Sequence, residues 1–191
     1  MVNRKTIHSH LGLKIPSPWV ARFSPLIPRG AWVLDLAAGG GRHCEHLTNL
    51  GLKVTAIDRD TSFIDPKFAT EIICHDLESN SPWPLQGRKF AGIIVTNYLH
   101  RPLFPFLINA LEEGGVIIYE TFAQGNEAFS QPRNPDHLLK NAELLQAFAD
   151  LQIIAYEQGK IYTPKESVVQ RICAVSRLTF SPFSLYPSGN D

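Results

Sequence analysis

Short apolar runs bounded by Gly, Pro or Asp recur along the chain and predict a series of β-strands. Between several of them, apolar residues recur at helical spacing and predict helices near residues 42–51, 102–112 and 136–149. The pattern is therefore largely one of strands alternating with helices. The expected strands lie near residues 31–37, 52–58, 70–75, 90–97, 114–121, 151–157 and 168–178.

The pairing of these strands follows from what lies between them. Helical crossovers require neighbouring strands to run parallel with both faces covered, which accounts for unbroken apolar runs such as Ile93-Ile94-Val95. Gly159 to Ser167 are too few residues for such a crossover, so the last two strands are expected to pair antiparallel. The prediction is an α/β fold, a doubly wound seven-stranded mostly parallel sheet with a C-terminal antiparallel hairpin.

Length and composition favour a single domain over residues 1–191. Hydrophobic residues make up 44% of the chain and charged residues 19%, a balance typical of a folded protein with one substantial core. Both ends of the chain are rich in Pro, Ser and Gly. We therefore expect an N-terminal docking arm over residues 1–18, a core over residues 31–178 and a loose tail over residues 179–191.

Charge and cysteine content narrow the range of partners. Eighteen basic residues match eighteen acidic ones, so the chain has no overall field that would concentrate nucleic acid or an anionic membrane. Three cysteines without a Cys-x-x-Cys pair argue against a disulfide framework and a thiolate zinc site. His43 and His46 share a helical spacing but have no evident third ligand, so no metal site is expected. Because no signal peptide or membrane-spanning segment is evident, we expect a cytoplasmic protein.

The strongest chemical signal is a run of glycines in the segment 35–42, DLAAGGGR, between the first expected strand and the first expected helix. Glycines let the main chain approach a ligand closely, and N–H groups at a helix start favour an anionic group. A phosphate-binding loop would end in Gly-Lys-Ser or Gly-Lys-Thr, and a dinucleotide fingerprint would need glycine where Cys44 stands. A tight turn without a ligand is the remaining structural alternative.

This segment resembles the first motif of class I methyltransferases, Asp/Glu-x-Gly-x-Gly-x-Gly, with Ala37 in place of the first glycine. Segments that resemble the family's later motifs follow at 54–58, 72–77, 93–102 and 115–122. The resemblance covers about residues 31–178, and its nearest type is the small single-domain group that includes the tellurite-resistance type methyltransferases. It implies a Rossmann-like methyltransferase fold, S-adenosyl-L-methionine as the cofactor, and methyl transfer as the activity.

The resemblance also implies where the donor binds. In that family the acidic residue of the first motif, here Asp35, organises the loop near the amino-acid end of the donor. The carboxylate that ends the second strand, here Asp58, accepts the ribose hydroxyls, a contact that would also suit NAD. Asp76 would accept from the adenine amino group, although either aspartate alone is as readily a turn or cap residue. The expected cofactor-binding residues are Asp35, Ala37, Gly39, Gly41, Arg42, His43, Asp58, Arg59, Asp76, Leu77 and Asn97.

The acceptor side is expected after the fourth strand, where Tyr98, His100 and Arg101 are the predicted catalytic residues. His100 is the candidate base because imidazole titrates near neutral pH. The alternative is that these side chains cap a helix or bind the adjacent loop. Residues 122–135 form a long expected loop beside the pocket, either a lid or an ordinary surface loop.

The acceptor is expected to be a small molecule. Methyltransferases of nucleic-acid amines typically carry Asn/Asp-Pro-Pro-Tyr/Phe after the fourth strand, whereas this chain has Asn97-Tyr98-Leu99-His100. The balanced charge adds no strong nucleic-acid signal. An RNA or protein acceptor held by a partner is an alternative. Two further hypotheses keep the fold: a noncatalytic binder of S-adenosylmethionine or another nucleoside, and an NAD-dependent oxidoreductase.

Overall fold

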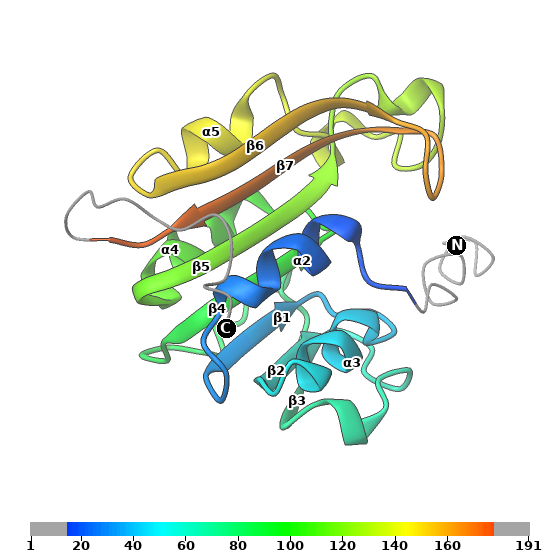
Figure 1. Ribbon diagram of the computed structural model, residues 1–191. Helices are drawn as coiled ribbons and strands as arrows, with labels where there is room; N and C mark the ends of the chain where they lie inside the picture. The colour runs from blue at the N-terminus through cyan, green and yellow to red at the C-terminus, as the bar shows by residue number, and fades with distance from the viewer. Residues whose placement is uncertain (1–14, 178–191) are drawn as a thin grey trace.

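The computed structural model describes residues 15–177 (Figure 1). Residues 1–14 of the expected N-terminal arm and the whole expected tail, residues 179–191, lie outside the described residues. The centre of the fold is a seven-stranded sheet with the strand order β3-β2-β1-β4-β5-β7-β6. Its strands are β1 (Trp32–Leu36), β2 (Lys53–Asp58), β3 (Glu71–Cys74), β4 (Phe90–Thr96), β5 (Leu111–Phe122), β6 (Gln152–Ile161) and β7 (Ser167–Val175).

The pairing of the strands confirms the predicted fold class. The first five strands run parallel to one another, and β7 pairs antiparallel with both β5 and β6. Only residues 162–166 connect β6 to β7, which leaves no room for a helix between them. The strand order reverses between β1 and β4, so the sheet is doubly wound and has its switch point at the carboxyl ends of these two strands.

Both faces of the sheet are covered by short helices (Figure 1). They are α2 (Pro18–Phe23), α3 (Arg42–Asn49), α4 (Phe104–Ala110) and α5 (Glu143–Ala147). One buried cluster joins α2 and α3 to residues such as Val33 and Ile94, and the other joins α4 and α5 to residues such as Leu34 and Ile93. Successive strand residues point to opposite faces, so one unbroken apolar run supplies both clusters.

The segment 136–149 differs from the single helix that its apolar spacing predicts. Within it only α5 is α-helical, and it follows the short 3₁₀ turn η5 (Pro135–His137). Between the two, the Leu139 N–H donates to the Phe122 carbonyl, and the Leu139 carbonyl accepts from the Gln124 N–H. Pairing with the end of β5 therefore replaces helical hydrogen bonds here, and the spacing of apolar residues could not reveal it.

Two smaller differences concern the bounds of α4 and the presence of α2. The segment 102–112 is helical only in α4, after the 3₁₀ turn η3 (Arg101–Leu103), because Leu111 already pairs with Phe90 as part of β5. The helix α2 was not predicted, although Ser17 caps it and proline follows at its first position.

Among the described residues, no helix combines the length and apolar character needed to cross a bilayer. The other 3₁₀ turns are η1 (Ser24–Leu26), η2 (Pro66–Phe68) and η4 (Asn126–Ala128).

Candidate functional site

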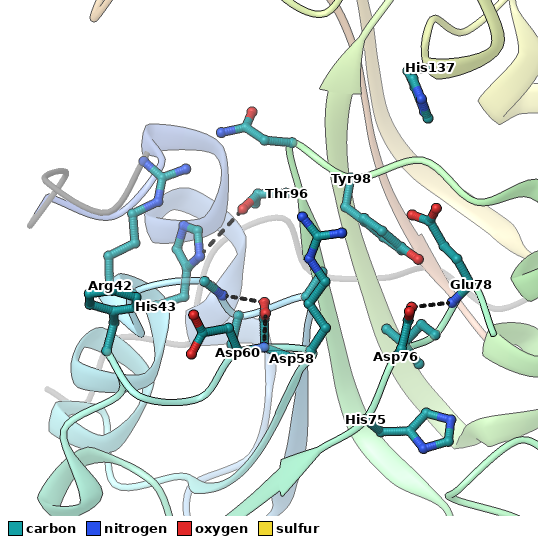
Figure 2. Close-up of a pocket in the computed structure, with 18 residues that line it drawn as sticks. Arg42, His43, Asp58, Asp60, His75, Asp76, Glu78, Thr96, Tyr98 and His137 are labelled. Atoms are coloured by element: carbon teal, nitrogen blue, oxygen red, sulfur yellow. Dashed lines mark hydrogen bonds between the residues drawn. The ribbon is translucent and has the colours of Figure 1, made fainter. Parts of the chain in front are cut away.

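A cavity of about 480 Å³ opens at the carboxyl ends of the parallel strands. Figure 2 shows the loops after β1 to β4 that frame it. Doubly wound sheets bind ligands at this edge, where the strand order reverses. Of the expected cofactor-binding residues, all but Asp35 and Gly41 line the cavity. The lining residues are 37–40, 42–43, 58–60, 63, 75–78, 96–98 and 137.

The loop after β1 is built from left-handed backbone. The φ angles of Ala37, Gly39 and Gly41 are 54°, 56° and 75°. Glycine adopts this region freely, whereas the Cβ of Ala37 crowds the following carbonyl at a cost of roughly 1–2 kcal/mol. A Cβ on Gly41 would lie 3.3 Å from Ile64 Cγ2, so this glycine serves close packing beneath the cavity. The result is a turn that presents the main chain of residues 37–40 to a ligand.

Asp58 ties the glycine loop to the loop after β2. Its Oδ2 accepts from the Gly39 N–H at 2.8 Å, and its Oδ1 accepts from the Asp60 N–H at 3.0 Å (Figure 2). These two bonds hold the carboxylate in place at the cavity wall. Each oxygen keeps a further lone pair, so the carboxylate can also accept from two hydroxyl groups of a ligand.

Asp35 lies beneath the glycine loop and outside the cavity lining. It is 1% exposed, and its Oδ2 accepts from the Cys44 thiol at 3.2 Å. Burial raises the pKa of this carboxyl to about 7, while the hydrogen bond from Cys44 and the charge of Arg42 oppose the shift. The loop therefore has a carboxyl group beneath it that is close to its titration point at neutral pH.

His43, in the first turn of α3, is buried and neutral. Burial lowers its pKa to about 3, and the neighbouring Arg42 and His46 act in the same direction. Its Nε2 accepts from the Ser17 N–H at 3.2 Å, so the proton is on Nδ1, which faces Thr96 Oγ1 at 3.5 Å (Figure 2). Both ring nitrogens are occupied, and the side chain acts as a fixed part of the cavity wall.

The chain just before α2 is attached beside this end of the cavity. Ser17 Oγ donates to Glu120 Oε1 at 2.9 Å, and Glu120 Oε2 forms an ion pair with Arg171 Nε at 2.9 Å. The carbonyl of Ile15 accepts from Arg42 Nη1 at 3.4 Å. Residues 15–17 therefore connect α3 to β5 next to the pocket, and Glu120 in turn links β5 to β7.

The opposite end of the cavity is formed by residues after β3 and β4. Asp76 Oδ1 accepts from the Glu78 N–H at 3.0 Å, which closes a tight turn. The Tyr98 ring extends toward Glu78 (Figure 2), and burial followed by the nearby Glu78 raises the pKa of its phenol. The Tyr119 hydroxyl donates to the Tyr98 carbonyl at 2.8 Å. Asn97 has a φ of 54°, a strained value that turns the chain out of β4 and into the cavity.

Two of the predicted catalytic residues, His100 and Arg101, are not among the lining residues. The Arg101 guanidinium donates to both carboxylate oxygens of Glu143 and to the carbonyls of Asp136 and Leu138. These bonds bind the adjacent segment, which is the alternative that the sequence left open. Tyr98 is the member of the predicted set that reaches the cavity.

The cavity also contains residues that the sequence did not single out. Most of these residues lie next to a motif residue or a few positions after one. The motifs therefore indicated whole loops after strands and not single lining positions. His137 had no such signal, because it lies in a segment expected to be helical. Residues 122–135, the expected lid or surface loop, contribute no lining residue, and their buried Asn126 accepts from the Val168 N–H of β7. The residues missed are Ala38, Gly40, Asp60, Phe63, His75, Glu78, Thr96 and His137.

The cavity presents both signs of charge to a ligand. Carboxylates from the end of β2 and the loops after β2 and β3 line it together with arginines from α3 and from the loop after β2. Within residues 15–177, no group of three or more His, Cys, Asp or Glu side chains is arranged to hold a metal ion. The arrangement suits an organic ligand that has hydroxyl groups together with positive and negative charges.

No model of a protein family matches the sequence, and no curated protein matches it either. Among solved structures, TehB from Haemophilus influenzae matches with a TM-score of 0.69 at 16% identity over 85% of this chain, which spans 63% of the TehB chain. A SAM-dependent methyltransferase from Methanosarcina mazei matches with a TM-score of 0.65 at 14% identity, over 86% of this chain and 100% of that chain. The N-methyltransferase NodS from Bradyrhizobium japonicum, in complex with S-adenosyl-L-homocysteine, matches with a TM-score of 0.61 at 14% identity. The match covers 90% of this chain and 97% of the NodS chain.

These matches show that the chain has the fold of class I S-adenosylmethionine-dependent methyltransferases, as the motif resemblance implied. The [4+2]-cyclase SpnF has the same fold, with a TM-score of 0.59 at 12% identity. Because one fold supports different reactions, the activity of this chain has to be argued from its site.

Proposed function

We propose that this chain is an S-adenosyl-L-methionine-dependent methyltransferase that acts on a small-molecule acceptor. The observation that carries the proposal is the Asp58 carboxylate, held by the N–H groups of Gly39 and Asp60 at the wall of the 480 Å³ cavity. This arrangement suits a nucleoside whose ribose hydroxyls meet the carboxylate beside a glycine-rich main chain. NAD would use the same carboxylate, but the loop lacks the dinucleotide fingerprint.

The donor would lie along the cavity from the glycine loop to the loop after β3. Its amino-acid end would meet the main chain of residues 37–40 and Arg42, whose guanidinium can pair with a carboxylate. Its adenine would lie near Asp76, where the carboxylate can accept from the exocyclic amine. The sulfonium would then lie near Asn97 and Tyr98, between the two ends.

Methyl transfer from a sulfonium requires alignment more than acid catalysis. The lone pair of the acceptor forms a bond to the methyl carbon while the carbon–sulfur bond breaks, and sulfur leaves as a neutral thioether. The protein mainly has to hold these three atoms in line and exclude water. Tyr98, which lines the cavity and whose ring extends toward Glu78, is suited to line this path (Figure 2).

A small acceptor is supported by the balanced charge of the chain and by proteins that share the fold. One of them is the N-methyltransferase NodS, and another is coclaurine N-methyltransferase bound to N-methylheliamine, with a TM-score of 0.58 at 10% identity. An RNA or protein acceptor is the alternative within the same chemistry. A role other than methyl transfer is the second candidate, because the cyclase SpnF has this fold.

Calorimetric titration with S-adenosylmethionine, S-adenosylhomocysteine and NAD tests the donor. The two sulfur compounds are expected to bind and NAD is not. Asp58→Asn should weaken their binding by about 10- to 100-fold, because an amide replaces a charged acceptor of ribose hydroxyls. Asp150→Asn, which removes an exposed carboxylate away from the cavity, is the matched control. Binding of NAD without binding of either sulfur compound would overturn the proposal.

Transfer of a radiolabelled methyl group tests the reaction. The protein is incubated with labelled S-adenosylmethionine and, separately, with a small-molecule cell extract, total RNA and total protein. Label in the small-molecule fraction is the expected result. Label confined to RNA or protein would contradict the proposed acceptor class, and donor binding without any transfer would favour a role other than methylation.

A further inference from the structure

His137 differs in origin from the other residues that line the cavity. Among the described residues, the others belong to the last residues of β2 and β4, to the loops after β1 to β4 or to the start of α3, whereas His137 ends η5, beyond β5 in the chain. Figure 2 shows its imidazole extending from that turn on the side of the cavity that holds Tyr98 and Glu78. It therefore enters from the side opposite the glycine loop.

Arg101 holds the turn that carries His137. Its Nη1 donates to the Asp136 carbonyl at 2.6 Å and its Nη2 donates to the Leu138 carbonyl at 2.9 Å, and these two residues flank the histidine. The same guanidinium donates to Glu143 through Nε at 2.6 Å and through Nη2 at 3.0 Å. One planar group thus fixes the backbone on both sides of the imidazole.

The arginine also links this turn to the cavity-forming end of β4. Arg101 opens η3, three residues after the last of the lining residues 96–98. Its partner Glu143 has a side chain that is 15% exposed and accepts in addition from the Lys140 N–H at 2.7 Å. A shift of the turn would break these bonds, so the main chain at His137 keeps a defined position relative to the end of β4.

The other imidazole groups near the cavity, and the Tyr98 phenol, are poorly suited to remove a proton from an acceptor. His43 has both ring nitrogens occupied, and burial lowers its pKa. The Tyr98 phenol has a raised pKa and keeps its proton. His100 does not line the cavity, and His75 follows β3, where the adenine is proposed to lie. His137 is the remaining imidazole in the lining.

We infer that His137 is a catalytic residue that accepts a proton from the methyl acceptor, and that Arg101 and Glu143 position it; this rests on the proposed methyltransferase function. The acceptor is then an amine or a hydroxyl compound with a proton on its attacking atom. The lone pair of that atom bonds to the methyl carbon, and the carbon–sulfur bond breaks with its electron pair passing to sulfur. The proton moves to an imidazole nitrogen and from there to water.

The titratable groups around the imidazole come from each neighbouring element. Asp136 lies on the same turn, Arg101 and Glu143 form an ion pair behind it, and Tyr98 and Glu78 belong to the same cavity. The buried Asp35 carboxyl beneath the glycine loop has a pKa raised to about 7 by burial, so it also titrates in the range of imidazole. An activity change in this range is therefore assigned to His137 only if it is lost in His137→Ala and retained in Asp35→Asn.

The test uses the full chain, radiolabelled S-adenosylmethionine and the small-molecule extract. His137→Ala is expected to lower kcat by about 100-fold or more, to leave the affinity for S-adenosylhomocysteine unchanged, and to remove the acidic limb of the pH profile. Added imidazole should restore part of the activity of this variant, which a purely structural role would not allow. Arg101→Lys keeps the charge but cannot span both carbonyls and the carboxylate, so kcat should fall by about 10- to 100-fold at unchanged donor affinity.

His100→Ala is the direct comparison, because it removes the neighbouring histidine that does not line the cavity. Undiminished transfer by His137→Ala would overturn the inference and leave the proposed function intact. Loss of the acidic limb in His100→Ala, with the limb retained in His137→Ala, would do the same. Failure of the wild-type protein to bind S-adenosylhomocysteine would overturn both proposals.

Discussion

Replacing Asp35 by asparagine is expected to stabilise the protein above neutral pH. The carboxyl is 1% exposed, and burial raises its pKa in the folded chain to about 7. In the unfolded chain the group has its ordinary pKa, near 4. Between these two values the folded chain keeps a proton that the unfolded chain releases, so the free energy of unfolding falls as the pH rises through this window.

The magnitude follows from the separation of the two values. About 3 pKa units correspond to about 4 kcal/mol, since each unit is worth about 1.4 kcal/mol. Asparagine has nearly the same shape and does not ionise, and its carbonyl oxygen can still accept from the Cys44 thiol. We therefore expect the stability of Asp35→Asn, relative to wild type, to increase by up to about 4 kcal/mol between pH 4 and pH 8.

Urea denaturation at several pH values between 4 and 8 measures this difference. Asp150→Asn, which removes an exposed carboxylate, is the control and should follow the wild type throughout. A difference between Asp35→Asn and wild type that stays constant across the range would refute the reasoning, because Asp35 would then ionise alike in both states. Binding of S-adenosylmethionine should weaken in the same variant, since its cationic groups would lose a negative charge beneath the glycine loop.

Two further substitutions probe strain and buried charge near the site. Ala37→Gly should raise the free energy of unfolding by about 1 kcal/mol, because glycine relieves a left-handed residue with a φ of 54°; a lower stability in urea would contradict this account. Glu120→Gln should lower the stability by about 3 kcal/mol, because it leaves Arg171, whose side chain is 14% exposed, without its nearer carboxylate. Thermal denaturation measures that loss, and adding Arg171→Met should recover part of it if the unpaired charge is the cause.

The sheet could be predicted because burial on both faces leaves a local pattern. Each expected strand corresponds to one in the structure, with ends that differ by a few residues. The glycine loop could be recognised for a similar reason, since a left-handed turn before a helix favours residues without a Cβ. Helices were harder to place, because α2 and α5 have only six and five residues and show little periodicity.

Patterns within single segments were thus enough to establish the α/β fold, the strand directions and the loops that surround the pocket. Which side chains of those loops enter the cavity depends on contacts between distant segments. Arg101 bonds to carbonyls 35 and 37 positions away, and these bonds direct its guanidinium to the turn that carries His137. Asp35 is buried because α3 covers the face of β1 on which its carboxyl lies. Contacts of this kind produce no periodic pattern of apolar and polar residues in the sequence. They can therefore be seen only in the tertiary structure, where the distant segments pack together.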